Sequence, residues 1–424
     1  MRTPSTPEPA AASFPVPDPA TDPEAQPAAG TESTAPGPEE PTPPTRQRKR
    51  RLRRLLKRPS VRIVLGVFAV CFGWLSWSIG SAIAAPGNDS LEAKVAEWGR
   101  DHHLGPVVTF LESAQYKANP PKIGGTPNMA LKPEVAADTP SAVKPALKPI
   151  VLPRLISPAG TPLAGEGNWE VLGSVRGTPA VMGAYVRPDN EHTSYVAGVV
   201  SMDQRVLRFD LHPGESDPGP DKWGVPPDVP AGARTGLLAT FNGGFKVDEA
   251  LGGFYLNGIT HGTLAPGGAS LVYYKDGHAK VGAWGKDVTM TPDVVGVRQN
   301  LKLIVDKAQV PESVDSNVES GWGLTIEGKY FVWRSGAGIT KDGRLVYVYG
   351  PALSVRTLAD LLKRAGCTEA MQLDINPAWM SFMYYKPVPD PKNPTPVKLL
   401  PSQERPANRY YEPTSRDFTA VFAK

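Results

Sequence analysis

The 424-residue sequence contains only two cysteines and six histidines, and this scarcity removes several classes of protein from consideration. Cysteine and histidine nowhere cluster at the spacing of a zinc site, and a His-Glu-x-x-His motif is absent. The glycine fingerprints of nucleotide-binding loops and the Gly-x-Ser-x-Gly elbow of serine hydrolases are missing as well. The sequence therefore predicts neither a metal nor a cofactor.

Large apolar residues are scarce in the first sixty positions, which hold 14 of the 47 prolines together with many Ala, Ser, Thr and Glu residues. Such a segment buries too little surface to offset the entropy lost on ordering. We therefore expect residues 1–60 to form a disordered cytoplasmic segment that is rich in proline and basic at its end.

Charge is absent from residues 63–85, which directly follow a basic run at 46–58. As a helix, these 23 residues measure roughly 34 Å, enough to cross a hydrocarbon core of about 30 Å. Flanking basic residues favour a cytoplasmic N-terminus, so we predict a single transmembrane helix over 61–85 and a cell-membrane protein with an extracytoplasmic C-terminal domain. Cleavage of a signal peptide after Ala84 is the alternative, although the apolar span is longer than a signal peptide requires.

A basic excess is missing from the exported part. Residues 1–62 hold 11 Lys/Arg and 7 Asp/Glu, which leaves 35 residues of each sign in the remainder. This balance argues against a nucleic-acid partner. Cys71 lies in the apolar span and Cys367 in the exported part, so the two cannot pair across a membrane.

Residues 86–165 are expected to connect the membrane helix to a folded domain. Apolar residues at helical spacing predict helix from Leu91 to Tyr116, interrupted at 102–106. The adjacent His102 and His103 face different ways on a helix, which favours a polar helix end over a metal site. Residues 117–165, rich in Pro, Lys and Ala, indicate an extended linker.

Residues 166–424 predict an α+β domain with a mostly antiparallel or mixed sheet and packed helices. Short β-like runs alternate with turn residues, and the turns at 275–278 and 341–344 are typical of hairpins. One helix interrupts the strands, with Ser354 as N-cap and Gly366 after its end. Its apolar stripe consists of Val355, Leu358, Leu361, Leu362 and Ala365.

Three motifs stand out in this domain. They are Ala239-Thr240-Phe241-Asn242-Gly243-Gly244-Phe245, the run from Arg334-Ser335-Gly336-Ala337-Gly338 to Lys341-Asp342-Gly343-Arg344, and Met371-Gln372-Leu373-Asp374. In type and order they resemble the phosphodiester glycosidase family, which removes a sugar such as N-acetylglucosamine from a sugar-1-phosphodiester. The family's glycine loop after the aspartate is replaced here by Ile375-Asn376-Pro377.

The resemblance implies roles for three residues. Asp374 would be the catalytic carboxylate, and Arg334 would bind the phosphate through two parallel hydrogen bonds that a lysine cannot make. Asn242 would bind substrate. From the residues alone, Arg334 suits an ion pair at a strand end equally well, and Asp374 suits a turn cap.

The remaining candidate residues are proposed from their positions in the sequence. Gly243 and Gly244 form a turn, in which glycine either supplies a positive φ or lets the backbone approach substrate. Ser335 adjoins Arg334 in a run of small residues, where a ligand can approach. Asn376 offers a side-chain amide at the place where the family's glycines are missing. Trp379 stacks on a sugar or belongs to the core. His261, in a glycine-rich turn, is the histidine best placed for acid–base work, or is an ordinary surface residue. Asp342 suits the hairpin turn, and Glu319 is a weaker candidate carboxylate.

These observations predict an exported hydrolase that cleaves a glycosyl-1-phosphodiester and acts on a sugar-phosphate or envelope glycopolymer. A non-catalytic protein of the same fold that binds such a polymer is the first alternative, favoured by the missing glycine loop. A hydrolase of ordinary glycosides or peptidoglycan is the second.

Overall fold

The computed structural model describes residues 58–84, 90–135, 145–219, 223–315 and 331–424. The disordered segment expected over 1–60 falls almost entirely outside these ranges, and so does Glu319. The chain divides into two compact units, 1–71 and 72–424, with the boundary inside the first described helix.

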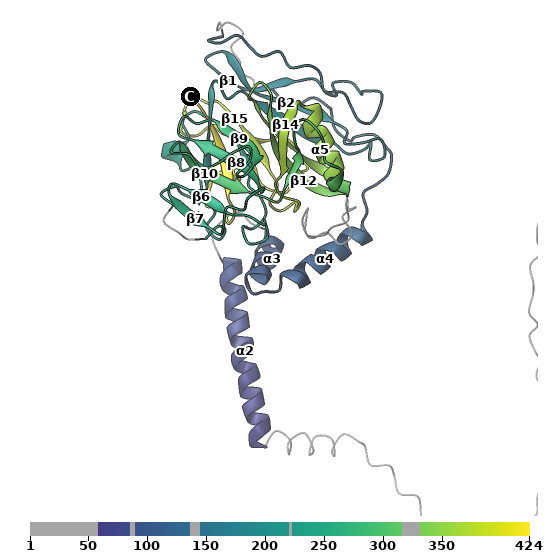
Figure 1. Ribbon diagram of the computed structural model, residues 1–424. Coiled ribbons are helices and arrows are strands. Elements are labelled where there is room, and N and C mark those ends of the chain that lie inside the picture. The colour runs from purple at the N-terminus through teal and green to yellow at the C-terminus, as the bar shows by residue number, and fades with distance from the viewer. Residues whose placement is uncertain (1–57, 85–89, 136–144, 220–222, 316–330) are drawn as a thin grey trace, which may run out of the picture. The chain divides into compact units, whose positions relative to one another are not determined.

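That helix, α2 (Pro59–Ala84), coincides closely with the predicted span at 61–85. It is long and apolar enough to cross a membrane, and nearly all of its side chains are exposed. Figure 1 shows α2 as one continuous helix. Length and composition thus support a membrane span or a signal sequence, the two alternatives that the sequence leaves open.

Two helices follow, α3 (Leu91–Asp101) and α4 (Gly105–Ala118), and they confirm the predicted interruption. The Ser90 hydroxyl accepts a hydrogen bond from the Ala93 amide at 3.2 Å and so caps the start of α3. His102 caps its end, and the Nδ1 atom of its ring lies 2.8 Å from the Trp98 carbonyl oxygen. The pair of histidines therefore marks a helix end, as the sequence indicates.

The β-rich part contains three sheets, and every strand pair among the described residues is antiparallel. The seven-stranded sheet has the order β1 (Glu170–Val175), β2 (Thr178–Val186), β3 (Ala197–Met202), β13 (Leu345–Leu353), β12 (Val332–Thr340), β14 (Cys367–Gln372), β11 (Leu303–Val305).

Two five-stranded sheets complete the domain. The second sheet has the order β7 (Ile259–His261), β6 (Phe254–Leu256), β10 (Val294–Gln299), β8 (Ala269–Tyr274), β9 (Ala279–Ala283). The third has the order β16 (Thr395–Lys398), β15 (Phe382–Lys386), β5 (Leu237–Asn242), β17 (Phe418–Ala423), β4 (Leu207–His212). Short 3-10 turns occur at Ala231–Ala233, Glu312–Asp315 and Arg409–Tyr411. The predicted antiparallel character of the sheet is confirmed, but the structure divides it into three sheets and has few helices.

Both predicted hairpin turns are present. Residues 275–278 join β8 to β9, and residues 341–344 join β12 to β13. Gly277 and Gly343 have φ values of 82° and 81°, a left-handed conformation that glycine adopts without strain. The Asp342 carboxylate accepts a 2.5 Å hydrogen bond from the Thr340 hydroxyl, so it stabilises the hairpin as expected.

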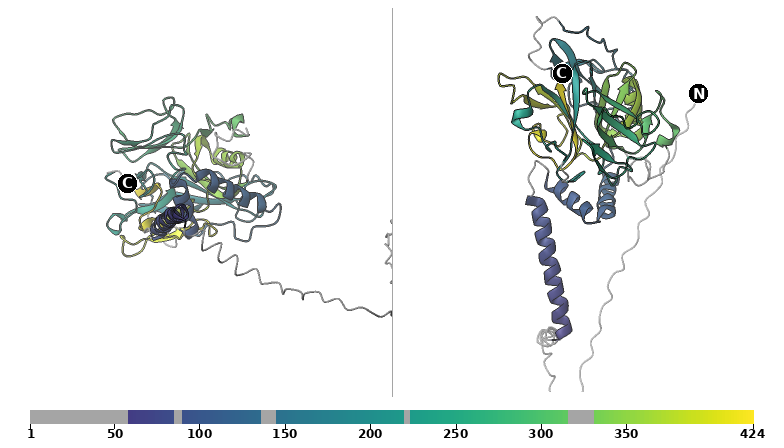
Figure 2. Two further views of the ribbon diagram at one scale, coloured as in Figure 1. Left: turned by 90° about the horizontal axis from the view of Figure 1, so that it is seen from below. Right: turned by 60° about the vertical axis from the view of Figure 1, so that its left-hand side comes forward.

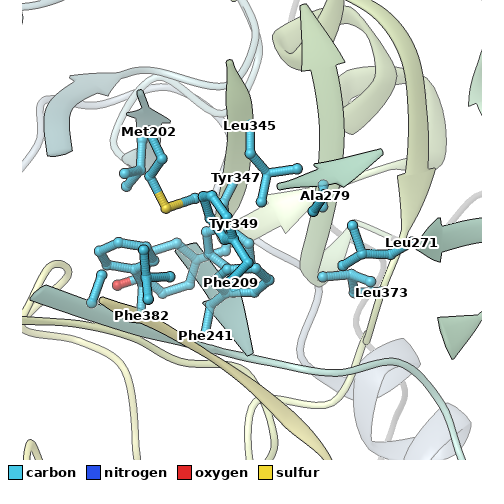
Figure 3. Packing of buried hydrophobic residues seen from close by; sticks show 14 of the residues in the cluster. Met202, Phe209, Phe241, Leu271, Ala279, Leu345, Tyr347, Tyr349, Leu373 and Phe382 are labelled. Carbon is cyan, nitrogen blue, oxygen red and sulfur yellow. The ribbon is translucent and has the colours of Figure 1, made fainter. Parts of the chain in front are cut away.

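The largest core cluster lies between the sheets. Figure 3 shows Phe241 and Phe382 of the third sheet close to Tyr347 and Tyr349 of the first. The ring centroids of Phe241 and Tyr347 are 5.0 Å apart. This packing holds β5 and β15 of the third sheet against β13 of the first.

The other face of the seven-stranded sheet is covered by α5 (Val355–Arg364). The Ser354 hydroxyl accepts a hydrogen bond from the Thr357 amide at 3.0 Å, and Gly366 follows at φ 92°, so both predicted caps are confirmed. The whole predicted stripe from Val355 to Ala365 is buried. In the right-hand view of Figure 2, α5 (green) and the C-terminal strands (yellow) lie on opposite sides of the β-rich part.

Candidate functional site

Three of the predicted site residues meet where strands of two sheets end. Asn242 is the last residue of β5, Ser335 lies near the start of β12, and Asp374 follows β14 by two residues. The Asn242 side-chain amide donates a 3.0 Å hydrogen bond to the Ser335 hydroxyl. That hydroxyl also accepts from the Asp374 amide at 3.1 Å, and the Ser335 amide donates to the Asp374 carbonyl at 2.9 Å. A direct chain of hydrogen bonds therefore joins the three motifs.

Asn242 is buried and fully engaged with protein groups. Its Nδ2 atom donates to Ser335 and to the Gly243 carbonyl at 2.8 Å. Its Oδ1 atom accepts from the Tyr347 hydroxyl at 2.6 Å and from the Ser381 amide at 3.1 Å. A primary amide has two donors and two acceptor positions, so this geometry gives Asn242 the role of holding β5, β12 and β13 in place.

Arg334 lies beside Ser335 but faces the opposite side of the sheet. Successive residues of a strand alternate between faces, and a side chain at Gly336 would meet Leu358 and Leu362 of α5. Arg334 therefore points to the α5 side, where it is fully buried. Its Nε atom donates to the Leu353 carbonyl and its Nη1 atom to the Gln372 side-chain oxygen, both at 2.8 Å.

Asp374 is a buried carboxyl group with an altered acidity. Its Oδ1 atom accepts hydrogen bonds from the amides of Ile375 and Asn376 at 2.7 and 2.8 Å, and these bonds favour the charged form. The charge of Arg416 acts in the same direction. Burial opposes them and dominates, raising the pKa of Asp374 to about 6. The turn-cap interpretation of Asp374 and its candidacy as an acid–base group thus apply together.

The glycines after Asn242 are required by close packing. Neither Gly243 nor Gly244 has a positive φ, so the expectation of a left-handed turn at these positions is wrong. A Cβ atom on Gly243 would lie 2.0 Å from the Asp417 carboxylate, and one on Gly244 would lie 2.8 Å from the Asn300 side-chain oxygen. Such separations are far shorter than atomic contacts allow, so only glycine fits.

Those neighbours belong to a buried polar network that the sequence analysis missed. Asp417 is paired with Arg298, whose Nε atom lies 2.9 Å from Oδ2 of the carboxylate. The Asn300 side chain accepts from the Phe245 amide at 3.1 Å and donates to the Gln372 and Leu373 carbonyls at 2.9 and 2.8 Å. The network therefore fixes the loop after β5 to the end of β14, next to Asp374.

A second missed group surrounds Trp379. The indole is 3% exposed, and the guanidinium carbons of Arg405 and Arg416 lie 4.8 and 4.9 Å from the centre of its ring. Arg409 lies 5.9 Å from the same ring and donates to the Trp379 carbonyl at 2.6 Å. In this structure Trp379 is buried among arginines, which corresponds to the core alternative. Arg416 is also the cation that acts most strongly on Asp374.

Of the other predicted site residues, His261 lies apart from this chain of hydrogen bonds, whereas Asn376 lies beside it. His261 ends β7, the edge strand of the second sheet, and is half-buried. Asn376 follows Asp374, and its side-chain oxygen accepts from the Ala378 amide at 2.9 Å. A pocket of about 480 Å³ lies elsewhere, between β4 and the β8–β9 hairpin, and none of the predicted site residues lines it.

A metal centre is not evident in the part of the chain that the structure describes. Among these residues, no group of three or more His, Cys, Asp or Glu side chains is arranged to hold a metal ion. The groups that the described residues offer around Asp374 include its own carboxyl, the Arg416 guanidinium and the amides of Ile375 and Asn376.

The comparisons with known proteins give matches among solved structures alone. No family model matches the sequence, and no curated protein matches it. The catalytic domain of zebrafish N-acetylglucosamine-1-phosphodiester alpha-N-acetylglucosaminidase, auto-inhibited by its pro-peptide, is 15% identical, with a TM-score of 0.40 over 67% of this chain and 96% of that one. A hypothetical protein from Synechocystis is 8% identical, with a TM-score of 0.36 over 61% and 64%.

A protein from Burkholderia pseudomallei is 11% identical, with a TM-score of 0.27 over 54% of this chain and 74% of that one.

Proposed function

We propose that the chain is a membrane-anchored hydrolase whose domain at 166–424 cleaves a glycosyl-1-phosphodiester, with cell-envelope glycans as the substrate class. The observation that carries this proposal is the environment of Asp374. It is a buried carboxyl group with a pKa of about 6, in the motif that resembles the phosphodiester glycosidase family.

Such a carboxyl group suits the reaction. Near neutral pH, a group with a pKa of about 6 is mostly ionised and can still accept and return a proton. A phosphate leaving group is already acidic, so cleavage at the anomeric carbon needs activation of water and stabilisation of ring charge more than a strong acid. Asp374 would supply both as a carboxylate.

The surrounding residues have supporting roles in this proposal. Ser335 and Asn242 hold the Asp374 backbone in place through the hydrogen bonds described above. Gly243 and Gly244 let Asp417 and Asn300 approach the same loop. Arg334 fixes Gln372 and the end of β14, and recognition of the substrate phosphate by its guanidinium stays a prediction.

Three roles carry less structural support and stay predictions. They are proton transfer by His261, substrate binding by the Asn376 amide, and sugar stacking by Trp379, whose ring is buried here. Substitution of each by Ala, followed by steady-state kinetics, separates these roles. A residue that contacts substrate changes KM or kcat at an unchanged melting temperature.

The test is turnover of a panel of sugar-1-phosphodiesters by the full chain in detergent, with release of free sugar as the readout. Asp374→Asn keeps the size of the side chain and removes its proton transfer, so we expect turnover to fall by roughly 10²–10⁴-fold. Arg334→Lys is expected to be nearly as harmful, because a single ammonium nitrogen cannot reach both acceptors that Nε and Nη1 of the guanidinium contact. Asp342→Asn, in the hairpin turn, is the control and should retain activity.

One observation favours a second function, a glycopolymer-binding protein without catalysis. The loop after Asp374 carries Pro377 where the family has glycines, and proline offers no amide to an anion. Two amides of that loop, from Ile375 and Asn376, are already bonded to the Asp374 carboxylate. Saturable binding of the diesters without release of sugar, unchanged in Asp374→Asn, would identify the protein as a binder.

A further inference from the structure

Arg416 forms an ion pair with a carboxylate that comes from a helix outside the sheets. Glu97 of α3 is 7% exposed, and its Oε2 atom lies 3.1 Å from Nη2 of Arg416. Its other oxygen lies 2.8 Å from the Lys246 ammonium, in the loop after β5. One carboxylate thus bridges two cations that belong to the β-rich part of the molecule.

Glu97 is present there as an anion. Burial alone would raise its pKa, but the charges of Arg416 and Lys246 and their hydrogen bonds overcome burial and lower the pKa below its ordinary value. The two cations therefore bind a negative oxygen group strongly enough to offset its loss of water.

Arg416 has a further hydrogen-bond donor that Glu97 does not use. It is 4% exposed, and its Nη1 atom has no hydrogen-bond partner among the described residues. A buried donor without a partner costs free energy that a suitable ligand recovers. Besides Glu97, the acidic groups whose charges act on Arg416 are Asp217 and Asp374, the proposed catalytic carboxyl.

Ion pairs connect the helix that carries Glu97 to the loop after β5 and to Arg416, which precedes β17. Asp101 also pairs with Lys246, and Arg100 lies 3.5 Å from Glu249. The apolar residues Leu91 and Val95 of α3 are exposed and do not anchor it. An ion pair can be exchanged for a contact with another anion, whereas an apolar contact cannot.

We propose that Arg416 and Lys246 form a binding site for a phosphate group and that the Glu97 carboxylate of α3 occupies this site until a phosphate-bearing ligand displaces it. The identification of that ligand as a sugar phosphodiester rests on the proposed function, whereas the phosphate site itself does not. A tetrahedral phosphate offers more oxygens than a carboxylate, so it can bond to Nη1 as well as to the groups that Glu97 contacts.

The experiment compares binding of inorganic phosphate to three forms of the full chain in detergent: wild type, Glu97→Gln and Glu92→Gln. Glu92 lies on the same helix but is exposed, so the second variant removes the same charge without changing the site. We expect Glu97→Gln to bind phosphate roughly 10- to 100-fold more tightly than wild type, since a competing hydrogen bond to a charged group is lost. Glu92→Gln should bind like wild type.

A double variant and a second measurement guard against misfolding. Glu97→Gln leaves a buried cation unpaired, so its melting temperature should fall and phosphate should restore it. The double variant with Arg416→Gln should lose this rescue. In wild type, phosphate should accelerate amide hydrogen exchange in residues 93–101 and leave α5 unchanged. Equal binding by all three forms, together with unchanged exchange in α3, would refute the site.

The outcome is separable from that of the proposed function, because inorganic phosphate binds without being hydrolysed. Tight binding by Glu97→Gln together with no turnover of any diester supports the site and removes the enzyme proposal. Turnover that depends on Asp374, together with equal phosphate binding by all three forms, supports the enzyme proposal and refutes the phosphate site. Tighter binding of methyl α-glucosyl phosphate than of free phosphate would assign the site to a glycan phosphodiester.

Discussion

At the scale of single residues, the Asp374 carboxyl is controlled by opposing influences. Two backbone amides and the Arg416 charge favour ionisation, while burial favours the protonated form and dominates. The pKa of about 6 therefore places its change of charge inside the range over which most proteins are folded. Its ionisation must then weaken folding, because the unfolded chain ionises the same group near pH 3.8 at no cost.

The predicted consequence is a loss of stability as the pH rises. Between pH 3 and pH 8, the free energy of unfolding of wild type should fall by about 3 kcal/mol relative to Asp374→Asn, as a shift of about two pKa units implies. Urea unfolding of both proteins across this range measures the difference. A difference that rises with pH would show that Asp374 has a lowered pKa and is stabilised as an anion.

Gly243 illustrates a residue whose identity is set by a distant partner. Because its Cβ would lie 2.0 Å from the Asp417 carboxylate, Gly243→Ala must displace the buried pair of Asp417 with Arg298. Disruption of a buried ion pair costs about 3–5 kcal/mol, and we expect a loss of stability in that range by chemical denaturation. Gly232→Ala is the matched control, since nothing lies within 4 Å of the added atom. Equal stability of the two variants would contradict this account.

Sequence motifs located Asn242, Ser335 and Asp374, because each lies in a recognisable pattern at the end of a strand. The pairing of Arg298 with Asp417 was not predictable in the same way. Arg298 lies in β10 and Asp417 immediately precedes β17, 119 positions away, so no local spacing relates them. The site at Arg416 was not predictable for the same reason, because Glu97, Lys246 and Arg416 are distant in sequence and meet only in the folded chain.

At the scale of elements, local sequence signals were sufficient to predict the hairpins and the helix α5. The two hairpins were predictable from Asp-Gly turns, and α5 from its cap and apolar spacing, because the residues that decide these elements are neighbours in sequence. The order of strands within the sheets was not predictable. β13 pairs with β3 and β5 with β17 through contacts between distant segments, which depend on the packing of the whole core.

The contribution of α5 is testable through Leu361, which is 2% exposed on the sheet side of the helix. Leu361→Ala removes three carbon atoms from this packing, and we expect the free energy of unfolding to fall by roughly 2–5 kcal/mol. Lys363→Ala, on the exposed face of the same helix, should change it by less than about 0.5 kcal/mol. Thermal and urea unfolding of both variants decide the matter; an unchanged Leu361→Ala would mean that α5 does not pack as described.

At the scale of the whole molecule, the proposed function depends on α2 as a membrane anchor. Its apolar span follows a run of basic residues at 46–58, an arrangement that favours retention of the N-terminus in the cytoplasm. Sugar-1-phosphodiesters of an envelope would then be encountered on the opposite side of the membrane. The proposed substrate class therefore depends on the orientation of α2 as much as on Asp374.

This orientation is tested with tags at both ends of the chain and protease added to intact cells. We expect the C-terminal tag to be removed and the N-terminal tag to be protected, since the basic residues 46–58 oppose translocation. Permeabilised cells, in which both tags are digested, provide the control for access. A soluble form that begins at Ala85 would instead show cleavage after Ala84, and the domain would then act as a secreted protein. Protection of the C-terminal tag would place Asp374 in the cytoplasm and exclude envelope glycans as its substrates.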